Sequence, residues 1–331
     1  MAMDLSVCIV NWNTKSLLKQ CLKSIYSRTQ GIKFEIIIVD NASWDGSVEM
    51  LKKEFPHCKV IESNINMGFS KGNNLAIKHA RGRYVLFLNP DTELRTNALS
   101  GMVKFLENNQ PYGAVGCKLL NKDLSIQLTC ARSFPTPFRE FCFLSFLDRI
   151  FLRSKIFEST EMRYWDHQKS KEVDCLSGAC VMTRRKVLEQ IGGFDESFFM
   201  YGEDIEFCYR IRNNGMNIFY LAEEEIIHYS GASSSQIKDS SFSAVMQRES
   251  NYKFIKNNYG TDRAVEFRIL VLIGSVIRIY GILGILPLLM ICSHYKKKLS
   301  VFSFKKYFKL ILWALNLNHA SFVNSQTTRR L

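Results

Sequence analysis

Short apolar runs alternate with amphipathic segments over residues 5–118. The apolar runs have the length and β-branched content of buried strands, and the segments between them have apolar residues at helical spacing. Strands are predicted at 6–10, 35–39, 58–62, 84–88 and 114–118. Helices are predicted at 14–28, 47–54, 70–80 and 97–108. This alternation is typical of βαβ units, so we predict an α/β fold with a mostly parallel central sheet and flanking helices.

Beyond residue 118 the alternation is less regular. A strand region is predicted at 173–183, a helix at 203–213 and a strand at 217–221. Residues 138–157 contain six phenylalanines among several basic residues. Such a segment suits a helix packed on the core and equally a flap that faces a membrane or an acceptor.

Residues 269–293 form an apolar stretch that is interrupted by Arg278 and three glycines. The stretch is long enough for a membrane span, although one central arginine opposes insertion by about 2.5–3.5 kcal/mol. Its glycines and Arg278 also share one stripe, which suits a helix lying in the membrane interface. A basic amphipathic helix then follows, with lysines 305, 306 and 309 beside Phe304, Phe308, Ile311, Leu312 and Leu315. We predict a domain at 1–266 and a membrane-associating helical region at 267–331, and leave open whether 269–293 spans the bilayer.

The charge of the chain is concentrated in that last region. The chain has 44 Lys+Arg and 31 Asp+Glu, a net charge of +13, yet residues 267–331 hold ten basic and no acidic residues, which leaves +3 for the rest. A nucleic-acid-binding function is therefore not expected. The hydrophobic content of 47% excludes wholesale disorder, and the ten cysteines form no Cys-x-x-Cys pair. We expect a reducing cytosolic environment and no secretory signal.

Small polar and acidic residues follow the predicted strands, at the edge where open α/β sheets build ligand sites. The first three blocks are Asn11-Trp12-Asn13-Thr14, Asp40-Asn41-Ala42-Ser43 and Asn66-Met67-Gly68-Phe69-Ser70-Lys71-Gly72-Asn73-Asn74. A carboxylate after a buried strand, as at Asp40, can accept hydrogen bonds from a base or a ribose hydroxyl. Ser43 has helix capping as an alternative role, and the Asn- and Gly-rich block can be a plain turn.

Further blocks occur along the rest of the chain. They are Asn89-Pro90-Asp91, Ser177-Gly178-Ala179, Gly193-Phe194-Asp195, Gly202-Glu203-Asp204 and His228-Tyr229-Ser230. Taken alone, Asp91 can cap a helix, and Glu203 and Asp204 can be favourable charges in a first helical turn. A lone histidine such as His228 is often a structural residue. No serine or cysteine triad and no GxxxxGK[ST] loop is present.

Together these ordered blocks resemble glycosyltransferase family 2, and specifically its rhamnosyltransferase-like members, over residues 5–235. The resemblance implies a GT-A, Rossmann-like fold and a nucleoside diphosphate sugar donor. It assigns donor binding to Asn11, Asn13, Asp40, Asn41, Ser43, Asn66, Gly68, Lys71, Asn73, Asn74, Asp91, Ser177, Gly178 and Asp195. Asp195 alternatively orients its loop or the acceptor.

The resemblance also implies a metal site and a catalytic base. Asn89-Pro90-Asp91 stands where the family has Asp-x-Asp, so Asp91 is the expected ligand of Mg²⁺ or Mn²⁺, with His228 as a second candidate ligand. Asn89 departs from the family pattern. Asp204 is the expected base that takes the proton from the acceptor hydroxyl, and Glu203 is the next candidate.

These features predict an inverting, metal-dependent enzyme that transfers one sugar, with L-rhamnose from dTDP-rhamnose as the leading donor. The expected acceptor is lipid-linked or polysaccharide, in cell-surface glycan synthesis at the cytoplasmic face of the membrane. The Gln-x-x-Arg-Trp motif of processive synthases is absent from the sequence, so non-processive transfer is expected. Two alternatives stay open, namely a nucleotidyltransferase on a related fold and a catalytically silent membrane-bound scaffold.

Overall fold

The structure is a computed structural model of the chain, and it describes residues 3–198, 201–229, 240–291 and 294–317. Its internal contacts divide the chain into two compact units. The first unit comprises residues 1–134 and 166–236, and the second comprises residues 135–165 and 237–331.

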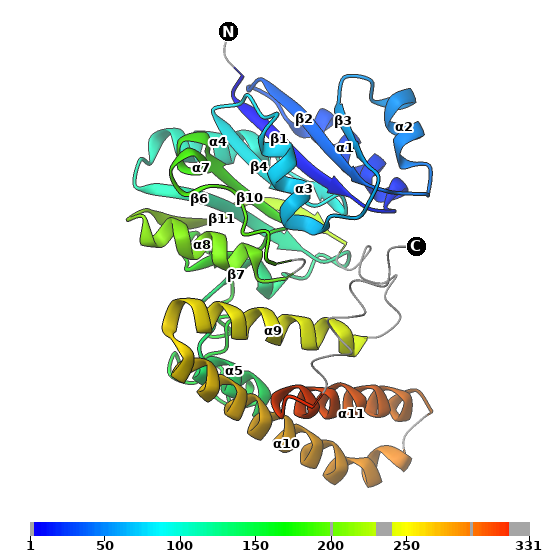
Figure 1. Ribbon diagram of the computed structural model, residues 1–331, viewed down its shortest axis with the longest axis vertical. Helices are drawn as coiled ribbons and strands as arrows, with labels where there is room; N and C mark the ends of the chain where they lie inside the picture. The colour runs from blue at the N-terminus through cyan, green and yellow to red at the C-terminus, as the bar shows by residue number, and fades with distance from the viewer. Residues whose placement is uncertain (1–2, 199–200, 230–239, 292–293, 318–331) are drawn as a thin grey trace. The chain divides into compact units, whose positions relative to one another are not determined.

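A nine-stranded sheet forms the centre of the first unit (Figure 1). Its strands are β1 (Leu5–Asn11), β2 (Phe34–Asn41), β3 (Lys59–Ser63), β4 (Tyr84–Leu88), β5 (Thr92–Leu94), β6 (Tyr112–Leu120), β8 (Lys171–Glu172), β10 (Cys180–Arg184) and β11 (Asn217–His228). The order is β3-β2-β1-β4-β10-β6-β11-β5, and β8 pairs with β11. The five strands predicted in residues 5–118 are confirmed, with ends that differ by up to two residues.

The sheet is mixed but mostly parallel, since β3, β2, β1, β4, β6 and β11 run in one direction and β10, β5 and β8 run against them. Strands β3, β2, β1 and β4 are parallel neighbours, but β10 lies between β4 and β6 and is antiparallel to both. Strands β5 and β8 are antiparallel to β11. Strand β10 has this direction because the chain enters it at the carboxyl edge of β4, where Cys180 pairs with Leu88. An alternation of apolar and amphipathic segments does not specify strand direction.

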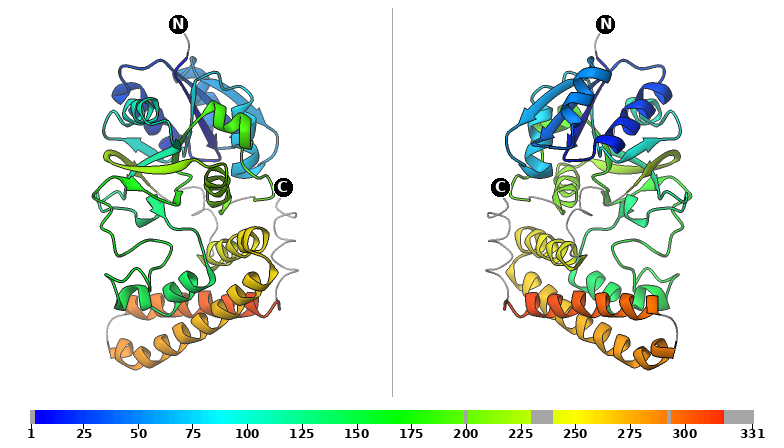
Figure 2. Two further views of the ribbon diagram at one scale, coloured as in Figure 1. Left: turned by 90° about the vertical axis from the view of Figure 1, so that its left-hand side faces the viewer. Right: turned by 90° about the vertical axis from the view of Figure 1, so that its right-hand side faces the viewer.

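The helices of the first unit cover both faces of the sheet (Figure 2). They are α1 (Lys15–Arg28), α2 (Ser47–Glu54), α3 (Gly68–Ile77), α4 (Ala98–Asn108), α7 (Arg185–Ile191) and α8 (Glu203–Asn213). The core beside the sheet is apolar, and Val7, Ile9 and Ile38 are fully buried in it. Helix α8 begins and ends at the predicted residues.

Strand β11 is longer than the predicted 217–221. A register shift between Leu221 and Glu225 takes residues 222–224 out of the regular ladder, and pairing with β6 resumes at Glu225, opposite Lys118. Such a bulge bends a strand and redirects its end. Here it carries the strand on to His228, whose partner in β5 is Thr92. Because residues 223–225 are acidic, the hydrophobic pattern did not predict that the strand continues beyond them.

A small second sheet also belongs to the first unit. It consists of β7 (Ala131–Arg132) and β9 (Cys175–Leu176), which pair antiparallel, and a short 3-10 helix (Leu128–Cys130) precedes it. The residues directly after β9, 177–179, lead into β10. This sheet therefore brings the segment around residue 130 to the loop that opens β10.

The second unit is helical and consists of α5 (Pro137–Leu144), α6 (Leu147–Ile150), α9 (Ser240–Tyr259), α10 (Thr261–Ile291) and α11 (His294–Ala314). Helix α10 packs against α5, α9 and α11, and both views in Figure 2 show α10 and α11 side by side. Gly274 allows the close approach to α5, because a Cβ there would lie 2.5 Å from Leu144 Cβ. The phenylalanine-rich segment is thus partly helical and belongs to this unit.

Charged side chains are buried inside the second unit. The Arg248 guanidinium lies 2.7 Å from Glu140 Oε1, and both side chains are about 5% exposed. Arg278 donates to the carbonyl oxygens of Phe143 and Leu144 at the end of α5, and its guanidinium lies 3.2 Å from the centre of the Phe146 ring. A cation at a helix C-terminus is favourable. Arg278 therefore has a packing role within the apolar stretch.

The predicted boundary after residue 266 falls inside α10. In the structure α9 packs with α10 and α11, so the helical unit begins before that residue. The predicted boundary followed the charge along the sequence, whereas the two units follow contacts within the fold. The predicted membrane association of 267–331 stays a prediction. Within the described parts of the chain, none of the helices combines the length and apolar character needed to cross a membrane.

Candidate active site

The ends of β1 and β2 form a buried polar network. Asn11 Nδ2 donates to Asp40 Oδ2 at 2.8 Å and to Ser43 Oγ at 3.1 Å. The Ser43 amide donates to Asp40 Oδ1 at 2.8 Å, and the Asn13 amide donates to Ser43 Oγ at 2.9 Å. Parallel strands that end at one edge bring these predicted residues together. The Asp40 carboxylate is thereby held in one orientation while only 2% exposed.

The third predicted block opens α3. Gly68 has φ of +81°, which favours glycine, and its amide donates to Asn66 Oδ1 at 2.9 Å. Asn41 Nδ2 donates to the Gly68 carbonyl at 3.1 Å, so this block contacts the end of β2. Asn73 Nδ2 donates to the Phe69 carbonyl, and Lys71 is exposed. Among the described residues, Asn41 Oδ1 and Asn73 Oδ1 are buried acceptors with no hydrogen-bond partner.

Asn74 lies apart from this network. Its side-chain amide donates to the Phe194 carbonyl and accepts from the Phe194 amide, both at 2.8 Å. Asp195 Oδ1 accepts from the Ser197 amide at 2.9 Å. The structure thus places Asn74 and Asp195 where α3 meets the 192–198 loop, and both hold that loop in shape.

Asp91 and His228 form the second cluster, as predicted. Asp91 Oδ1 lies 3.3 Å from His228 Nε2, and both side chains are mostly buried. Asn89 Nδ2 lies 3.3 Å from the same nitrogen. On the other side of the ring, Gln127 Oε1 lies 3.0 Å from His228 Nδ1, while Gln127 Nε2 donates to the His228 carbonyl. An amide oxygen only accepts, so Nδ1 carries a hydrogen, and in the neutral ring Nε2 presents its lone pair on the side of Asp91 and Asn89.

The donors in this cluster fit a divalent cation that is shared with a ligand. In the portion of the chain that the structure describes, no three His, Cys, Asp or Glu side chains lie close enough to hold a metal by themselves. A carboxylate oxygen and an imidazole lone pair nevertheless face each other at 3.3 Å, an arrangement that a cation between them stabilises. Mg²⁺ is commonly held by one or two protein groups together with phosphate oxygens and water. Asp91 and His228 are of the kind and number that such a share requires.

The third cluster is built around the start of α8. Asp204 Oδ2 accepts from the Gly178 amide at 3.0 Å and lies 2.6 Å from Arg132 Nη2. Asp204 Oδ1 accepts from the Ile205 amide at 2.8 Å. The Ala179 amide in turn lies 3.3 Å from Ser177 Oγ. Both predicted residues of the 177–178 block therefore lie beside the predicted base.

Glu203 and Asp204 are neighbours in sequence but differ in environment. Burial and the nearby Asp204 charge raise the pKa of Glu203 to about 8. Glu203 is 7% exposed, and within the described residues its Oε2 has no hydrogen-bond partner. Asp204 instead has a guanidinium and two amide donors. At neutral pH Glu203 is therefore a neutral acid beside an ion-paired Asp204.

The clusters of Asp91 and Asp204 share one edge of the sheet. The Asn89 backbone amide donates to the Ala179 carbonyl at 3.0 Å, and Leu88 pairs with Cys180. The 177–179 loop therefore connects the cluster of Asp91 and His228 to the carboxylate of Asp204. Such a connection places a candidate cation site and a candidate base on the two sides of one short loop.

Three side chains at this edge were not singled out from the sequence. Gln127 and Arg132 come from the irregular segment after β6, and each acts by contacting a residue distant in sequence. Trp44 is 74% exposed beside the Asp40 network and packs edge-on against Trp12. Only Trp44 had a sequence signal, since a tryptophan in a polar loop is an available stacking surface.

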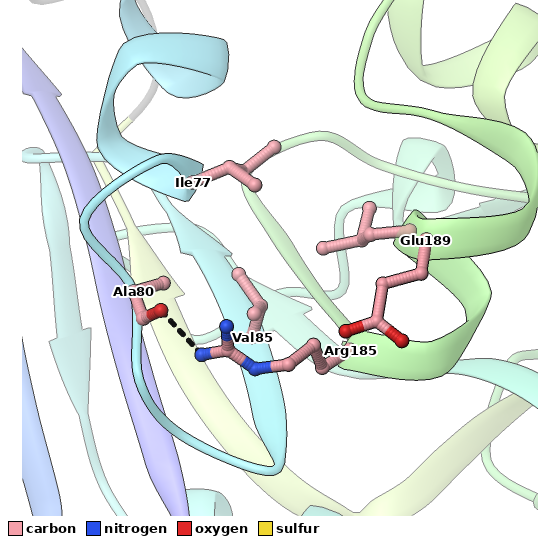
Figure 3. Close-up of a pocket in the computed structure, with 6 residues that line it drawn as sticks. Ile77, Ala80, Val85, Arg185 and Glu189 are labelled. Carbon is pink, nitrogen blue, oxygen red and sulfur yellow. Dashed lines mark hydrogen bonds between the residues drawn. The ribbon is translucent and has the colours of Figure 1, made fainter.

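A separate small pocket lies away from this edge (Figure 3). Ile77, Val85, Leu188 and Glu189 are among the residues that line it, and Arg185 closes one side by donating to the Ala80 carbonyl. Its volume of about 120 Å³ is well below the 300–1,000 Å³ of typical ligand sites. The pocket holds none of the predicted site residues.

Comparison with known proteins agrees with this fold. The family model described as glycosyl transferase family 2 matches residues 6–192, more than half of the chain, and a model described as N-terminal domain of galactosyltransferase matches residues 161–231. The mixed α/β architecture with a central sheet and flanking helices is GT-A-like. The chain belongs to glycosyl transferase family 2 and is a glycosyltransferase.

The proteins similar to this chain include named sugar transferases. The low-salt glycan biosynthesis hexosyltransferase Agl10 of Haloferax volcanii is 31% identical over 68% of this chain and 67% of its own. Rhamnosyltransferase WbbL of Escherichia coli is 25% identical over 67% of this chain and 82% of its own. Mannosyltransferase PcManGT of Pyrobaculum calidifontis, solved with GDP-Man and Mn²⁺, has a TM-score of 0.58 at 17% identity and covers 97% of this chain and 88% of its own.

Proposed function

We propose that this glycosyltransferase transfers a single sugar, with inversion, from a nucleoside diphosphate sugar to a lipid-linked or polysaccharide acceptor in cell-surface glycan synthesis. L-rhamnose from dTDP-rhamnose is the proposed donor. The observation that carries the proposal is the shared edge at which Asp91 and His228 lie near the Gly178 and Asp204 pair. The named rhamnosyltransferases among the relatives support the choice of sugar.

The three clusters divide the work of sugar transfer. The Asp40 network holds the nucleoside, since an oriented buried carboxylate suits a base or ribose donor. Asp204 takes the proton from the acceptor hydroxyl as that oxygen attacks the anomeric carbon. Within the pair, Asp204 is the carboxylate that accepts from the Arg132 guanidinium and two amides, whereas burial raises the pKa of Glu203 and favours its neutral form. Ordering donor and acceptor at one edge lowers the entropic barrier to reaction.

Asp91 and His228 would hold a divalent cation, Mg²⁺ or Mn²⁺. When bound, such a cation neutralises charge on the leaving diphosphate. Two solved structures similar in fold contain Mn²⁺, namely GalNAc-T7 and PcManGT, and this supports the proposal. Gln127 keeps the His228 ring in the tautomer whose Nε2 lone pair faces Asp91.

We further propose a peripheral or monotopic location at the cytoplasmic face of the membrane. Helix α10 exposes Val265, Ile269, Ile273 and Ile277 at successive four-residue steps, which is one continuous apolar stripe. On α11 the predicted stripe is exposed at Phe304 and Phe308, and also at Leu315 just after the helix. Tyr307, Leu310 and Trp313 of α11 are buried. Exposed apolar stripes beside lysines suit a surface of anionic lipid.

Flotation with lipid vesicles tests this location. Full-length protein is mixed with vesicles of phosphatidylcholine alone, or with vesicles of phosphatidylcholine and about 30% phosphatidylglycerol. We expect binding to the anionic vesicles, weakened in Ile273→Ser/Ile277→Ser. The exposed polar double variant Glu196→Ala/Lys71→Ala in the first unit serves as the control. Equal flotation of all proteins with both vesicles would count against the proposal.

Thermal stabilisation tests the function itself. Purified protein is heated with UDP-, dTDP- and GDP-sugars, each with and without Mg²⁺ or Mn²⁺. A donor at a hundredfold excess over its Kd adds about 2.7 kcal/mol to the free energy of unfolding. We expect a metal-dependent shift with dTDP-rhamnose, lost in Asp91→Asn. A folded protein that no donor stabilises would point to the silent scaffold instead.

A further inference from the structure

Arg132 is a charged residue at the candidate active site that neither binds the donor or the metal nor takes the acceptor proton in the proposed reaction. Arg132 lies in β7, opposite Cys175 of β9. Its Nη2 is 2.6 Å from Asp204 Oδ2, and the two side chains are 12% and 13% exposed. Its Nε is buried and, among the residues described, has no hydrogen-bond partner. An arginine buried this far with one donor group unused is not explained by packing alone.

The contacts of Asp204 show what Arg132 does to it. An aspartate in the first turn of a helix normally turns towards the amides of its own helix, and Oδ1 does so by accepting from Ile205. Oδ2 instead accepts from the Gly178 amide and pairs with Arg132, both outside α8. The orientation of the carboxylate is therefore set jointly by its helix, the 177–179 loop and β7.

Space around this carboxylate is limited. A Cβ at Gly178 would lie 3.4 Å from Asp204 Cβ and 3.6 Å from Phe69 Cζ. The backbone of the loop thus approaches Asp204 from one side, while Arg132 occupies another. With two sides taken, an incoming hydroxyl group reaches the carboxylate from a restricted direction.

We propose that Arg132 is a positioning residue for the catalytic base, and that it holds the Asp204 carboxylate in the orientation that receives the acceptor proton. The inference rests on the proposed function and deepens it. In the reaction, the acceptor oxygen bonds to the anomeric carbon and its proton passes to Asp204. The bond from that carbon to the diphosphate oxygen breaks, and its electron pair leaves with the nucleoside diphosphate. Arg132 keeps its own protons throughout.

The test uses full-length protein and dTDP-L-rhamnose with Mg²⁺, and follows release of dTDP with water as the acceptor. Variants are Arg132→Gln and Arg132→Lys, each alone and combined with Asp204→Asn. Arg81→Gln is the matched control, because Arg81 makes a two-pronged pair with Glu35 elsewhere in the same unit. Thermal melting of each variant establishes that it is folded, and donor affinity is measured separately from turnover.

We expect Arg132→Gln to lower kcat about 10- to 100-fold, the scale of a small misplacement of a reacting group, with donor affinity within about twofold of wild type. Arg132→Lys, which keeps the charge, should recover part of the loss. In the Asp204→Asn background, Arg132→Gln should cause no further loss, since it acts through Asp204.

Three outcomes would overturn the inference. They are an unchanged kcat in folded Arg132→Gln, a loss of donor affinity as large as the loss of kcat, and a full additional loss in the Asp204→Asn background. In each of these the wild type turns over, so the proposed function stands. If the wild type neither binds nor consumes any nucleotide sugar, the proposed function fails and this inference fails with it.

Discussion

Buried charges are treated differently in the two units of this chain. In the helical unit, Arg248 forms an ion pair with Glu140. Arg278 donates hydrogen bonds to two carbonyl groups and makes a cation–π contact with an aromatic ring. At the sheet edge of the first unit, Glu203 Oε2, Asn41 Oδ1 and Asn73 Oδ1 are among the described buried atoms without a hydrogen-bond partner. Buried polar atoms without a hydrogen-bond partner occur among the described residues of both units, and Ser159 Oγ, Asn251 Oδ1 and Ser275 Oγ are examples in the helical unit. The two regions differ in where such atoms lie, because those of the sheet edge belong to predicted donor and base residues.

An unmade hydrogen bond marks a functional group only where it coincides with the predicted site. A buried polar group with all its partners contributes to a unique packing, whereas one left unsatisfied costs about 1–3 kcal/mol unless a ligand completes it. At the sheet edge of the first unit this cost falls on Asn41, Asn73 and Glu203, which are predicted donor and base residues. Unsatisfied groups at that edge are therefore expected to matter for activity, and the paired groups of the second unit for stability.

Asp204→Asn should have the largest effect on activity. If Asp204 is the base, turnover should fall by about 10²- to 10⁴-fold while donor-induced stabilisation is retained, because amide and carboxylate have similar shapes. Steady-state release of the nucleoside diphosphate and thermal shift with the donor measure the two effects. Glu206→Gln, on the same helix, should change turnover little. Near wild-type turnover in Asp204→Asn would assign the base to another group.

Arg248→Met should have the largest effect on stability. Breaking a buried ion pair leaves Glu140 uncompensated and costs about 3–5 kcal/mol. Chemical denaturation measures this free energy directly. The double variant Arg248→Met/Glu140→Leu removes both charges and should regain most of the loss. A single variant as stable as wild type would remove the contrast between the two units.

Gln127→Leu should weaken metal binding about 10- to 100-fold, because it removes the acceptor that fixes the His228 tautomer. Calorimetric titration of Mn²⁺ into protein with excess dTDP measures this affinity without turnover. Asn89→Asp is the matched opposite change, since a second carboxylate at this cluster should tighten binding. Unaltered Mn²⁺ affinity in Gln127→Leu would mean that His228 is not a ligand.

Glu203→Gln should have the smallest effect, and one that depends on pH. The pKa of Glu203 is about 8 in the folded chain against 4.5 for an ordinary glutamate. Below pH 4.5 the group is protonated in both states and contributes nothing. As the pH rises towards 8 the unfolded state releases the proton more readily, so stability is lost over that window.

Glu203→Gln removes this loss. The variant should therefore gain at least about 1.4 kcal/mol relative to wild type between pH 5 and pH 8.5, the equivalent of one pKa unit. Melting temperatures of the two proteins without donor, at both pH values, measure the gain. An equal difference at the two pH values would show that Glu203 is ionised in the folded chain.

Local patterns were sufficient to predict much of the fold and the site. The strands 6–10 and 84–88 and the helix that starts at Glu203 were predicted because each has its own apolar period or capping charge. The grouping of Asn11 with Asp40 was predictable because parallel strands end at a common edge. Gln127 and Arg132 were not, since each makes its key contact with a residue more than 70 positions away.

The sequence by itself determined the polar residues that close each strand, and with them the family and the kind of chemistry. Only the tertiary structure decided the direction of β10, the bulge that carries β11 to His228, and the pairing of Arg132 with Asp204. The physical reason is range. Hydrophobic periodicity and capping act within a few residues, whereas strand direction and charge pairing depend on segments that meet only when the chain packs.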